Sequence, residues 1–299
     1  MYKCLVTGGA GFVGSNLVDA LIECGDEVVI LDNLSTGKRE NLNPKATFVE
    51  VDLRDLEKIK PHFVGIDYVF HTAALARVQP SIIDPVTYND HNVNGTLNVL
   101  VAAKDAGVKK VVYSASSSAY GDQKVMPLTE DLPANAISPY GLQKYIGEEY
   151  CRLFSYVYKL PTVCLRYFNV YGPRMVLTGA YASVIGIFGR QRQAGQPLTI
   201  VGDGEQLRTY TYVQDIVKGN LFAADSDISD GRPINIGQST EYTVNQIAAM
   251  IGGPATNLPP RIEPRRNLCD SSLAKKLLNW EPEMDLPEWI PSYKKLLNI

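Results

Sequence analysis

The octapeptide TGGAGFVG, residues 7–14, follows a strand-like apolar run and opens an amphipathic helical pattern. Glycines at positions 8, 11 and 14 allow a tight turn, a close approach of bare backbone to a pyrophosphate, and close packing of the helix on the strand. The helix N-terminus adds unpaired N–H groups and a partial positive charge. The motif predicts a dinucleotide-binding turn, and the alternative is a tight turn without a ligand.

Apolar runs alternate with helical patterns on the C-terminal side of this turn. We expect strands at residues 2–7, 27–32, 47–50, 68–71, 110–114 and 161–166. We expect helices at residues 12–24, 56–62, 89–106 and 139–158. This order is typical of an α/β protein with a Rossmann-type, doubly wound parallel sheet. Shorter elements and more loops follow Arg166. We therefore predict a dinucleotide-binding domain at residues 1–169, to which 213–237 returns, and a smaller C-terminal substrate-binding domain at residues 170–299.

The composition of the 299-residue chain excludes several classes of function. Its net charge of −3 gives no basic excess for nucleic acid, and no apolar run approaches the ~18–20 residues of a membrane span. The five cysteines include no C-x-x-C pair, which favours reduced thiols and a cytoplasmic location. The three histidines have no metal-ligand spacing, so we expect no metal site.

Two acidic residues follow the second and third expected strands. Asp32 lies 18 residues after Gly14, where a carboxylate accepts both ribose hydroxyls and repels a 2′-phosphate, which favours NAD over NADP. Lys38 and Arg39 could hold such a phosphate, but we interpret them as solvated loop charges. Asp52 is either an adenine contact or the N-cap of the helix expected from residue 56.

Two tyrosine–lysine pairs have the spacing of one helical turn. Tyr120 and Lys124 enclose a turn-like Gly-Asp-Gln, so their side chains need not meet. Tyr140 and Lys144 head a long helical pattern, where residues i and i+4 share a face. An ammonium beside a phenol lowers a pKa that is ordinarily about 10, which makes the phenol a usable base. The alternative for this second pair is an exposed helical contact without chemistry.

A run of serines, residues 114–118, ends the fifth expected strand. Ligands bind at this end of the strands in doubly wound sheets. A hydroxyl there could bind a substrate alcohol and pass its proton to Tyr140, whereas the alternative is a simple turn. The serines, Tyr140 and Lys144 together predict a catalytic site.

Motifs over nearly the whole chain match one family of enzymes. They are TGGAGFVGSNLVDAL, LDNLSTG, HTAALA, NVNGTLNVL, YSASSSAYGD, SPYGLQK, RYFNVYGPR, GAYASVI, GDGEQLRTYTYVQD and INIG. On these motifs the chain resembles the extended short-chain dehydrogenase/reductase family of nucleotide-sugar-modifying enzymes. Within that family it is most similar to the UDP-galactose and UDP-N-acetylglucosamine 4-epimerases.

The resemblance implies a role for individual residues. It makes Tyr140 the base, Lys144 its partner and a ribose contact, and Ser116 the hydroxyl that shares the substrate proton. It implies NAD as cofactor, held by Gly8, Gly11, Phe12, Val13, Gly14, Asp32, Asn33, Ser35, Thr36, Gly37, Asp52, Leu53, Ala73, Ala74, Ala76, Asn92, Ser114, Tyr140, Lys144 and Tyr167. It implies a UDP-sugar substrate, held by Ser116, Tyr140, Asn169, Ser183, Val184, Thr199, Val201, Arg208, Arg261 and Asn267. For Arg208, bidentate binding of a diphosphate agrees with its chemistry, and the alternative is a surface ion pair.

The implied reaction is C4 epimerisation of a UDP-hexose or UDP-N-acetylhexosamine through a transient 4-keto sugar. Other members of the family are uronate epimerases, decarboxylases, dehydratases and reductases. Ser116-Ser117-Ser118 replaces the Thr-Asp-Glu of dehydratases, and no further cation follows Gly172-Pro173-Arg174 to bind a uronate. A non-catalytic dinucleotide sensor is a further alternative, although such a protein is expected to lose the serine cluster, Tyr140 or Lys144.

Three further expectations come from the resemblance. Asn267 stands where a tyrosine is linked to plain hexoses, so the chain is expected to accept N-acetylated sugars as well. Arg77 occupies a substrate-facing loop where small residues are common, and it is either a surface charge or the sign of an unusual sugar. The helices at 89–106 and 139–158 are expected to form a homodimer interface.

Overall fold

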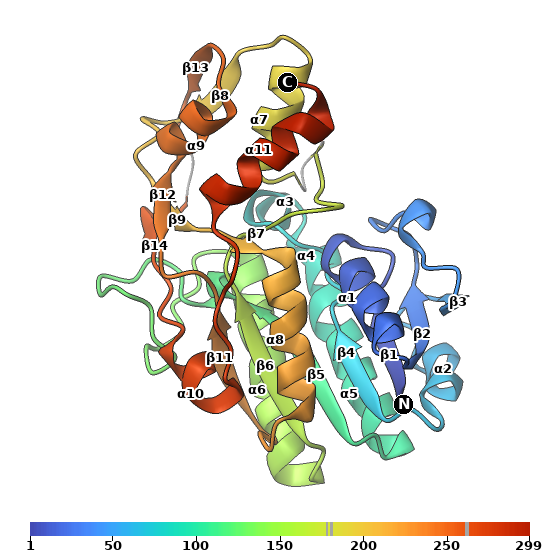
Figure 1. The fold of residues 1–299 in the computed structure, drawn as a ribbon. Coiled ribbons are helices and arrows are strands. Elements are labelled where there is room, and N and C mark those ends of the chain that lie inside the picture. Colours follow the sequence, from blue (N-terminus) through green and yellow to red (C-terminus); the bar gives the residue numbers. More distant parts are fainter. Residues whose placement is uncertain (178, 180–181, 261–262) are drawn as a thin grey trace.

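The computed structural model describes residues 1–177, 179, 182–260 and 263–299. Its centre is a sheet of parallel strands in the order β11-β6-β5-β4-β1-β2-β3 (Figure 1). The chain moves outward from β1 to β3, and then starts again at β4 on the other side of β1. This confirms the predicted doubly wound fold. The strands are β1 (Lys3–Thr7), β2 (Glu27–Asp32), β3 (Thr47–Glu50), β4 (Tyr68–His71), β5 (Lys110–Ser116), β6 (Thr162–Tyr167) and β11 (Asp230–Ile236).

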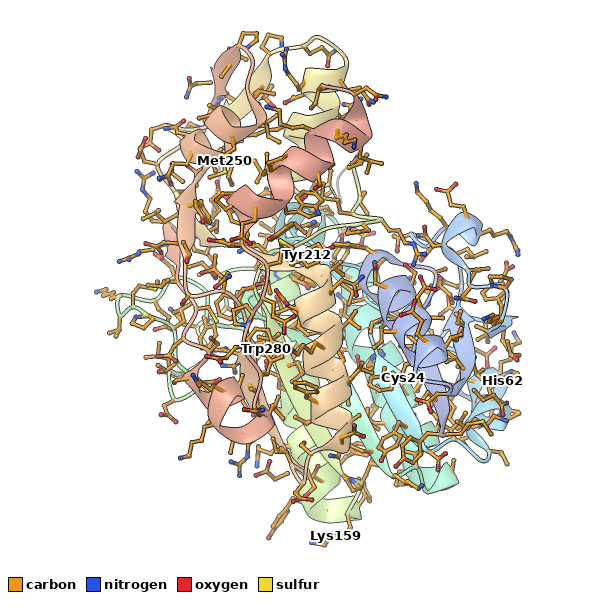
Figure 2. The ribbon with its side chains drawn as sticks, viewed as in Figure 1. Cys24, His62, Lys159, Tyr212, Met250 and Trp280 are labelled. Atoms are coloured by element: carbon orange, nitrogen blue, oxygen red, sulfur yellow. The ribbon has the colours of Figure 1, made fainter. Side chains whose placement is uncertain are left out.

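Helices cover both faces of this sheet because successive strand residues point to opposite sides. Cys4 and Val6 of β1 lie in one hydrophobic core, and Leu5 between them lies in the other. The first core includes residues of α1 (Phe12–Glu23), α8 (Val213–Asp225) and α10 (Ser272–Leu278). The second includes residues of α2 (Leu56–Ile59), α5 (Gly95–Ala106) and α6 (Pro139–Tyr158). Buried Trp280, labelled in Figure 2, joins α10 to α8 by donating from Nε1 to the Asp215 carbonyl oxygen at 2.8 Å.

Most of the C-terminal elements pack around a third core, above the sheet in Figure 1. Its helices are α7 (Val184–Gln193), α9 (Val244–Ile251) and α11 (Leu286–Leu297). Its small sheets contain β7 (Val170–Tyr171), β8 (Leu198–Val201), β9 (Leu207–Thr209), β10 (Thr211–Tyr212), β12 (Glu241–Thr243), β13 (Ala255–Leu258) and β14 (Arg266–Asn267). Strand β11 and helix α8 lie with the main sheet. The boundary at residue 170 stays a prediction.

Three elements differ from the expected ranges, and a fourth, helix α3 (Val78–Ile83), was not expected. The helix expected at 56–62 ends at Ile59 and continues as a 3-10 turn, because Pro61 has no N–H for an α-helical hydrogen bond. The helix expected at 89–106 is α4 (Pro85–Asn89), a π turn (Asp90–Asn94) and α5. The strand expected at 110–114 extends to Ser116.

Candidate functional site

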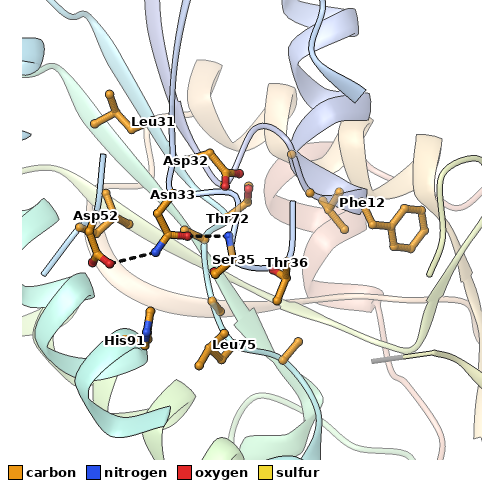
Figure 3. A pocket seen from close by; sticks show the side chains of 18 of the residues that line it. Phe12, Leu31, Asp32, Asn33, Ser35, Thr36, Asp52, Thr72, Leu75 and His91 are labelled. Atoms are coloured by element: carbon orange, nitrogen blue, oxygen red, sulfur yellow. Dashed lines mark hydrogen bonds between the residues drawn. The ribbon is translucent and has the colours of Figure 1, made fainter. Parts of the chain in front are cut away.

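A cavity of about 220 Å³ opens at the carboxyl edge of the main sheet, where α1 begins (Figure 3). Most of the expected cofactor contacts line it, namely Gly8, Gly11, Phe12, Val13, Gly14, Asp32, Asn33, Ser35, Thr36, Asp52, Leu53, Ala73, Ala74 and Ala76. The sequence did not single out as cofactor contacts the other lining residues, Leu31, Val51, Arg54, Thr72, Leu75, Arg77, His91 and Val176. Several of them are direct neighbours in sequence of the expected contacts. Their position at the ends of the predicted strands is the sequence signal that could have identified them.

The glycine-rich turn forms the floor of this cavity. Gly8 has a φ of +72°, and a Cβ there would lie 2.7 Å from the Ala73 Cα. A Cβ on Gly14 would lie 2.7 Å from the Thr72 hydroxyl oxygen and closer still to the Gly8 carbonyl oxygen. Gly11 precedes α1 as its N-cap, so the free N–H groups of the first helical turn face the cavity. An anion fits this cradle of bare backbone.

Asp32 ends β2 beside the turn and is 8% exposed. Its carboxylate accepts hydrogen bonds from the N–H groups of Ala10 at 3.0 Å and Leu34 at 2.8 Å. Burial raises the pKa of Asp32, and these two N–H groups oppose the change. Gly37 lies behind this carboxylate and not on the cavity wall, and a Cβ on Gly37 would lie 3.0 Å from both carboxylate oxygens.

The two cations after Gly37 form ion pairs with nearby glutamates. Lys38 pairs with Glu40, Arg39 pairs with Glu50, and both cationic side chains are 65% exposed. Their interpretation as solvated loop charges is confirmed.

Asp52 faces the cavity from the end of β3. It accepts a hydrogen bond from Asn33 Nδ2 at 2.9 Å, drawn in Figure 3. It also accepts two hydrogen bonds from the Arg54 guanidinium, at 2.8 and 3.0 Å. The hydrogen bonds from Arg54 hold the pKa of Asp52 well below its usual range. The alternative role as N-cap of the next helix was wrong, because Asp55 accepts the capping hydrogen bond from Lys58. The adenine contact stays a prediction.

The expected base and its partners meet where β5 ends and α6 begins. Ser138 caps α6 by accepting the N–H of Gly141 at 3.1 Å, and Pro139 occupies the first helical position. Tyr140 therefore lies in the first turn, and its phenol lies near Ser116, the last residue of β5, whose hydroxyl lowers the pKa of that phenol. Lys144 lies one turn further along the helix.

Burial controls the protonation of this group. It raises the pKa of Tyr140, while the hydrogen bond from Ser116 and the charge of Arg77 lower it. Burial also lowers the pKa of Lys144 to about 8. The Lys144 ammonium donates to the Ser114 carbonyl oxygen at 2.7 Å. The expected net lowering of the Tyr140 pKa is therefore corrected, because the loss of solvent around the phenol outweighs the charges near it.

The second tyrosine–lysine pair does not form a site. The Tyr120 ring is fully buried, and its hydroxyl donates to Asn235 Oδ1 at 2.7 Å. Lys124 is exposed. The expectation that these two side chains need not meet is confirmed.

Several expected cofactor contacts support the cavity from behind and do not line it. Asn92 accepts from the N–H of Leu75 at 2.8 Å and donates to the Leu75 carbonyl at 3.0 Å and to Gln143 at 2.9 Å. The Tyr167 hydroxyl is bonded to Ser114 Oγ and to Asn220 Oδ1, each at 2.9 Å. These bonds fix the loop after β4 and the ends of β5 and β6.

The expected diphosphate contact, Arg208, is on β9 and only 12% exposed. Its guanidinium pairs with Glu263 at 3.2 Å, so it forms an ion pair, but not one on the surface. Asn267 on β14 is in register with Arg208 and buried, and its Oδ1 has no hydrogen-bond partner within the described part of the chain. Arg261 lies outside the described residues.

The remaining expected substrate contacts have local partners. Asn169 donates to the Thr209 carbonyl oxygen at 2.8 Å, and the Thr199 hydroxyl accepts from Gln191 at 2.8 Å. Ser183 caps α7, which starts at Val184, and Val201 ends β8. Among the residues that the structure describes, no cluster could hold a metal ion, and no helix is long and apolar enough to cross a membrane.

Known proteins are similar to this chain in sequence and fold. A model of the NAD dependent epimerase/dehydratase family matches residues 4–237. The structure of UDP-glucose 4-epimerase from Thermotoga maritima with UDP-glucose is 39% identical, covers 99% of both chains and has a TM-score of 0.93. UDP-N-acetylglucosamine 4-epimerase from Methanobrevibacter ruminantium, with UDP-N-acetylmuramic acid, is 37% identical over 99% of this chain and 97% of that one, with a TM-score of 0.91. UDP-glucose 4-epimerase from Thermus thermophilus with NAD is 33% identical over 99% of each chain, also with a TM-score of 0.91.

Proposed function

This chain belongs to the NAD dependent epimerase/dehydratase family, and on that premise we propose that it interconverts the C4 epimers of a UDP-hexose or UDP-N-acetylhexosamine. The observation that carries the proposal is the arrangement at the carboxyl edge of the sheet, where Ser116 ends β5 beside Tyr140 in the first turn of α6, with Lys144 one helical turn away. Similar chains, named as UDP-glucose and UDP-N-acetylglucosamine 4-epimerases, support the choice of reaction.

The cofactor is NAD, and the cavity has the features that suit it. The backbone around Gly8 and Gly14 leaves no room for side chains, and the N-terminus of α1 opens toward a bound pyrophosphate. The buried carboxylate of Asp32 suits a ribose with free hydroxyls and disfavours a 2′-phosphate. When bound, NAD⁺ would supply the hydride acceptor for oxidation at C4 of the sugar, and NADH the hydride donor for the return step.

The chain's own residues manage the proton and the orientation of the sugar. Ser116 hydrogen-bonds the sugar 4-hydroxyl, and the Tyr140 phenolate removes its proton. After the planar 4-keto sugar has turned over, Tyr140 returns the proton to the new alkoxide. Arg208 exchanges Glu263 for the diphosphate, so the nucleotide is held while the sugar rotates.

Proton NMR of the purified chain tests this function most directly. UDP-glucose, UDP-N-acetylglucosamine and UDP-glucuronate are supplied in separate tubes with a catalytic amount of NAD. The C4 epimer is expected to appear with one or both of the first two sugars, and the Tyr140→Phe variant serves as the inactive control. Epimerisation of UDP-glucuronate alone, or a product other than the C4 epimer, would contradict the proposal.

The acceptance of N-acetylated sugars is proposed to depend on Asn267. The residue is buried, yet its carbonyl oxygen has no partner among the described residues, so an acetamido N–H could satisfy it. Asn267→Tyr is expected to reduce the rate of epimerisation of UDP-N-acetylglucosamine more than that of UDP-glucose in the same assay. Equal losses for the two sugars would contradict this role.

We also propose a cytoplasmic homodimer. The five cysteines are free thiols, and Cys24 is exposed, which suits a reducing compartment. Helix α6 exposes apolar side chains over its length, including Leu142 and Leu153. Such faces favour association with a second copy.

A further inference from the structure

Arg77 has a backbone conformation that arginine rarely adopts. It precedes α3 with φ 95° and ψ 140°, in the region where residues other than glycine are strained. Such strain costs on the order of 1–3 kcal/mol and collects at ligand clamps and active sites. A glycine at this position would avoid the strain, so the arginine side chain itself needs an explanation.

Side chains on both sides of Arg77 hold the backbone in place. On the N-terminal side, the Tyr88 hydroxyl donates to the Ala76 carbonyl oxygen at 3.1 Å. On the C-terminal side, Ser81 Oγ donates to the Val78 carbonyl oxygen at 2.6 Å and accepts the N–H of Tyr140 at 3.1 Å. Two hydrogen bonds therefore connect the residue after Arg77 to the first turn of α6.

This connection joins the loop that carries Arg77 to the backbone of the reactive tyrosine. Arg77 lines the cofactor cavity. Its charge is also one of the two influences that lower the pKa of Tyr140, and the hydrogen bond from Ser116 is the other. The hydrogen bonds through Ser81 and the effect of the Arg77 charge thus both connect this loop to Tyr140.

The groups that act electrostatically on Tyr140, or on which it acts, come from two other elements: Ser116 and Tyr113 are on β5, and Arg77 precedes α3. Lys144 lies one turn further along the same helix as Tyr140 and is not among the influences on its pKa. The Lys144 ammonium lies 4.9 Å from the centre of the Tyr113 ring. Because burial lowers the pKa of Lys144 to about 8, this side chain loses its charge as the solution becomes alkaline. A guanidinium keeps its charge over the whole range.

We propose that Arg77 is a positioning residue for the epimerisation, whose permanent positive charge stabilises the phenolate of Tyr140. The proposal rests on the proposed function only in assigning Tyr140 as the base. It gives a reason for the strained backbone, because the strain holds the charge beside the phenol. Under this proposal Arg77 is neither a surface charge nor the mark of an unusual sugar.

The test compares kcat–pH profiles of the wild type, Arg77→Met and Arg77→Lys. Activity needs the phenolate, so loss of the charge raises the pKa of Tyr140 and moves the acid limb to higher pH, by about one pH unit. At pH 7 the Met variant should lose about tenfold in kcat and approach wild-type kcat at alkaline pH, with KM unchanged. Lysine should restore the wild-type profile near neutral pH.

Two further variants separate charge from other effects. Arg77→Gly relieves the backbone strain, so its Tm should be higher than that of Arg77→Met. Its kcat–pH profile should show the same displaced acid limb as that of Arg77→Met. Arg54→Met removes another arginine of the same cavity, one that is hydrogen-bonded to Asp52 and Asp90. Its acid limb should stay in place.

Other outcomes would overturn the role. An unmoved acid limb combined with weaker NAD or UDP-sugar binding would make Arg77 a ligand contact. A loss of kcat that is equal at every pH would make it purely structural. If no variant has epimerase activity, ultraviolet titration of the Tyr140 phenol, as a difference from Tyr140→Phe, reads the effect of Arg77 without turnover. An unchanged titration would then refute the charge effect separately from the proposed function.

Discussion

At the scale of single residues, the spacing of Tyr140 and Lys144 predicts their relative position, whereas their surroundings set their pKa values. The spacing of Tyr140 and Lys144 indicated a shared helix face, and the structure provides that face. Their protonation depends on burial, which raises the pKa of the phenol and lowers the pKa of the ammonium. The charges expected to make Tyr140 a base therefore have to overcome desolvation.

Tyr140→Phe should reduce turnover by at least about 100-fold, because it removes a general acid–base group. Affinities for NAD and the UDP-sugar should remain close to wild type, because the ring remains; calorimetry and steady-state kinetics check both. Tyr120→Phe is the matched control from the other tyrosine–lysine pair. Its buried hydroxyl is bonded to Asn235, so the change should cost about 1 kcal/mol of stability and leave turnover intact. Near-normal turnover in Tyr140→Phe would remove this residue as the base.

At the scale of elements, the glycine turn couples β1, α1 and the end of β4. Gly14 lets α1 start directly over the Gly8 carbonyl and Thr72, and this contact sets the floor of the cavity. The intrinsic helix preference for alanine over glycine is about 1 kcal/mol. At position 14, the steric overlap of an alanine Cβ with the Gly8 backbone outweighs this preference.

Gly14→Ala should therefore lower the free energy of unfolding by about 2–3 kcal/mol and weaken NAD binding. Gly95→Ala, near the start of α5, is the control, because its Cβ would meet Leu53 at an ordinary 3.6 Å. That change should stabilise the chain by about 0.5–1 kcal/mol. Urea unfolding of the two variants measures both effects. Destabilisation by Gly95→Ala as large as that by Gly14→Ala would contradict the steric argument.

At the scale of the whole molecule, the exposed side of α6 carries apolar side chains that the proposed catalytic site does not use. Leu142, Leu153 and Val157 are 51%, 43% and 51% exposed. The first and the last turns of one helix thus present leucine or valine to solvent. A second copy of the chain would cover them.

The double change Leu142→Glu and Leu153→Glu should convert the proposed dimer to a monomer, because it buries charges in the interface. Sedimentation equilibrium measures the mass directly. Val64→Glu changes a valine that is 72% exposed and lies outside this helix, so it should not affect association. A wild-type chain that is monomeric at micromolar concentration would refute the dimer.

The sequence by itself determined the alternation of strands and helices, the glycine turn, the shared helix face of Tyr140 and Lys144, and the serines at the end of the fifth strand. These features are local, because each depends on a period of two or 3.6 residues or on a motif of a few residues. Expected ranges failed where backbone chemistry intervened, as at Pro61, or where tertiary contacts form a short helix such as α3.

Only the tertiary structure decided how these parts act on one another. It paired Asp52 with Arg54 and Arg208 with Glu263, and through Ser81 it joined the segment after Arg77 to the first turn of α6. It also decided the pKa directions of Tyr140 and Lys144. Such effects depend on burial and on charges that lie far apart in the chain, and only folding brings those groups within a few ångströms of one another.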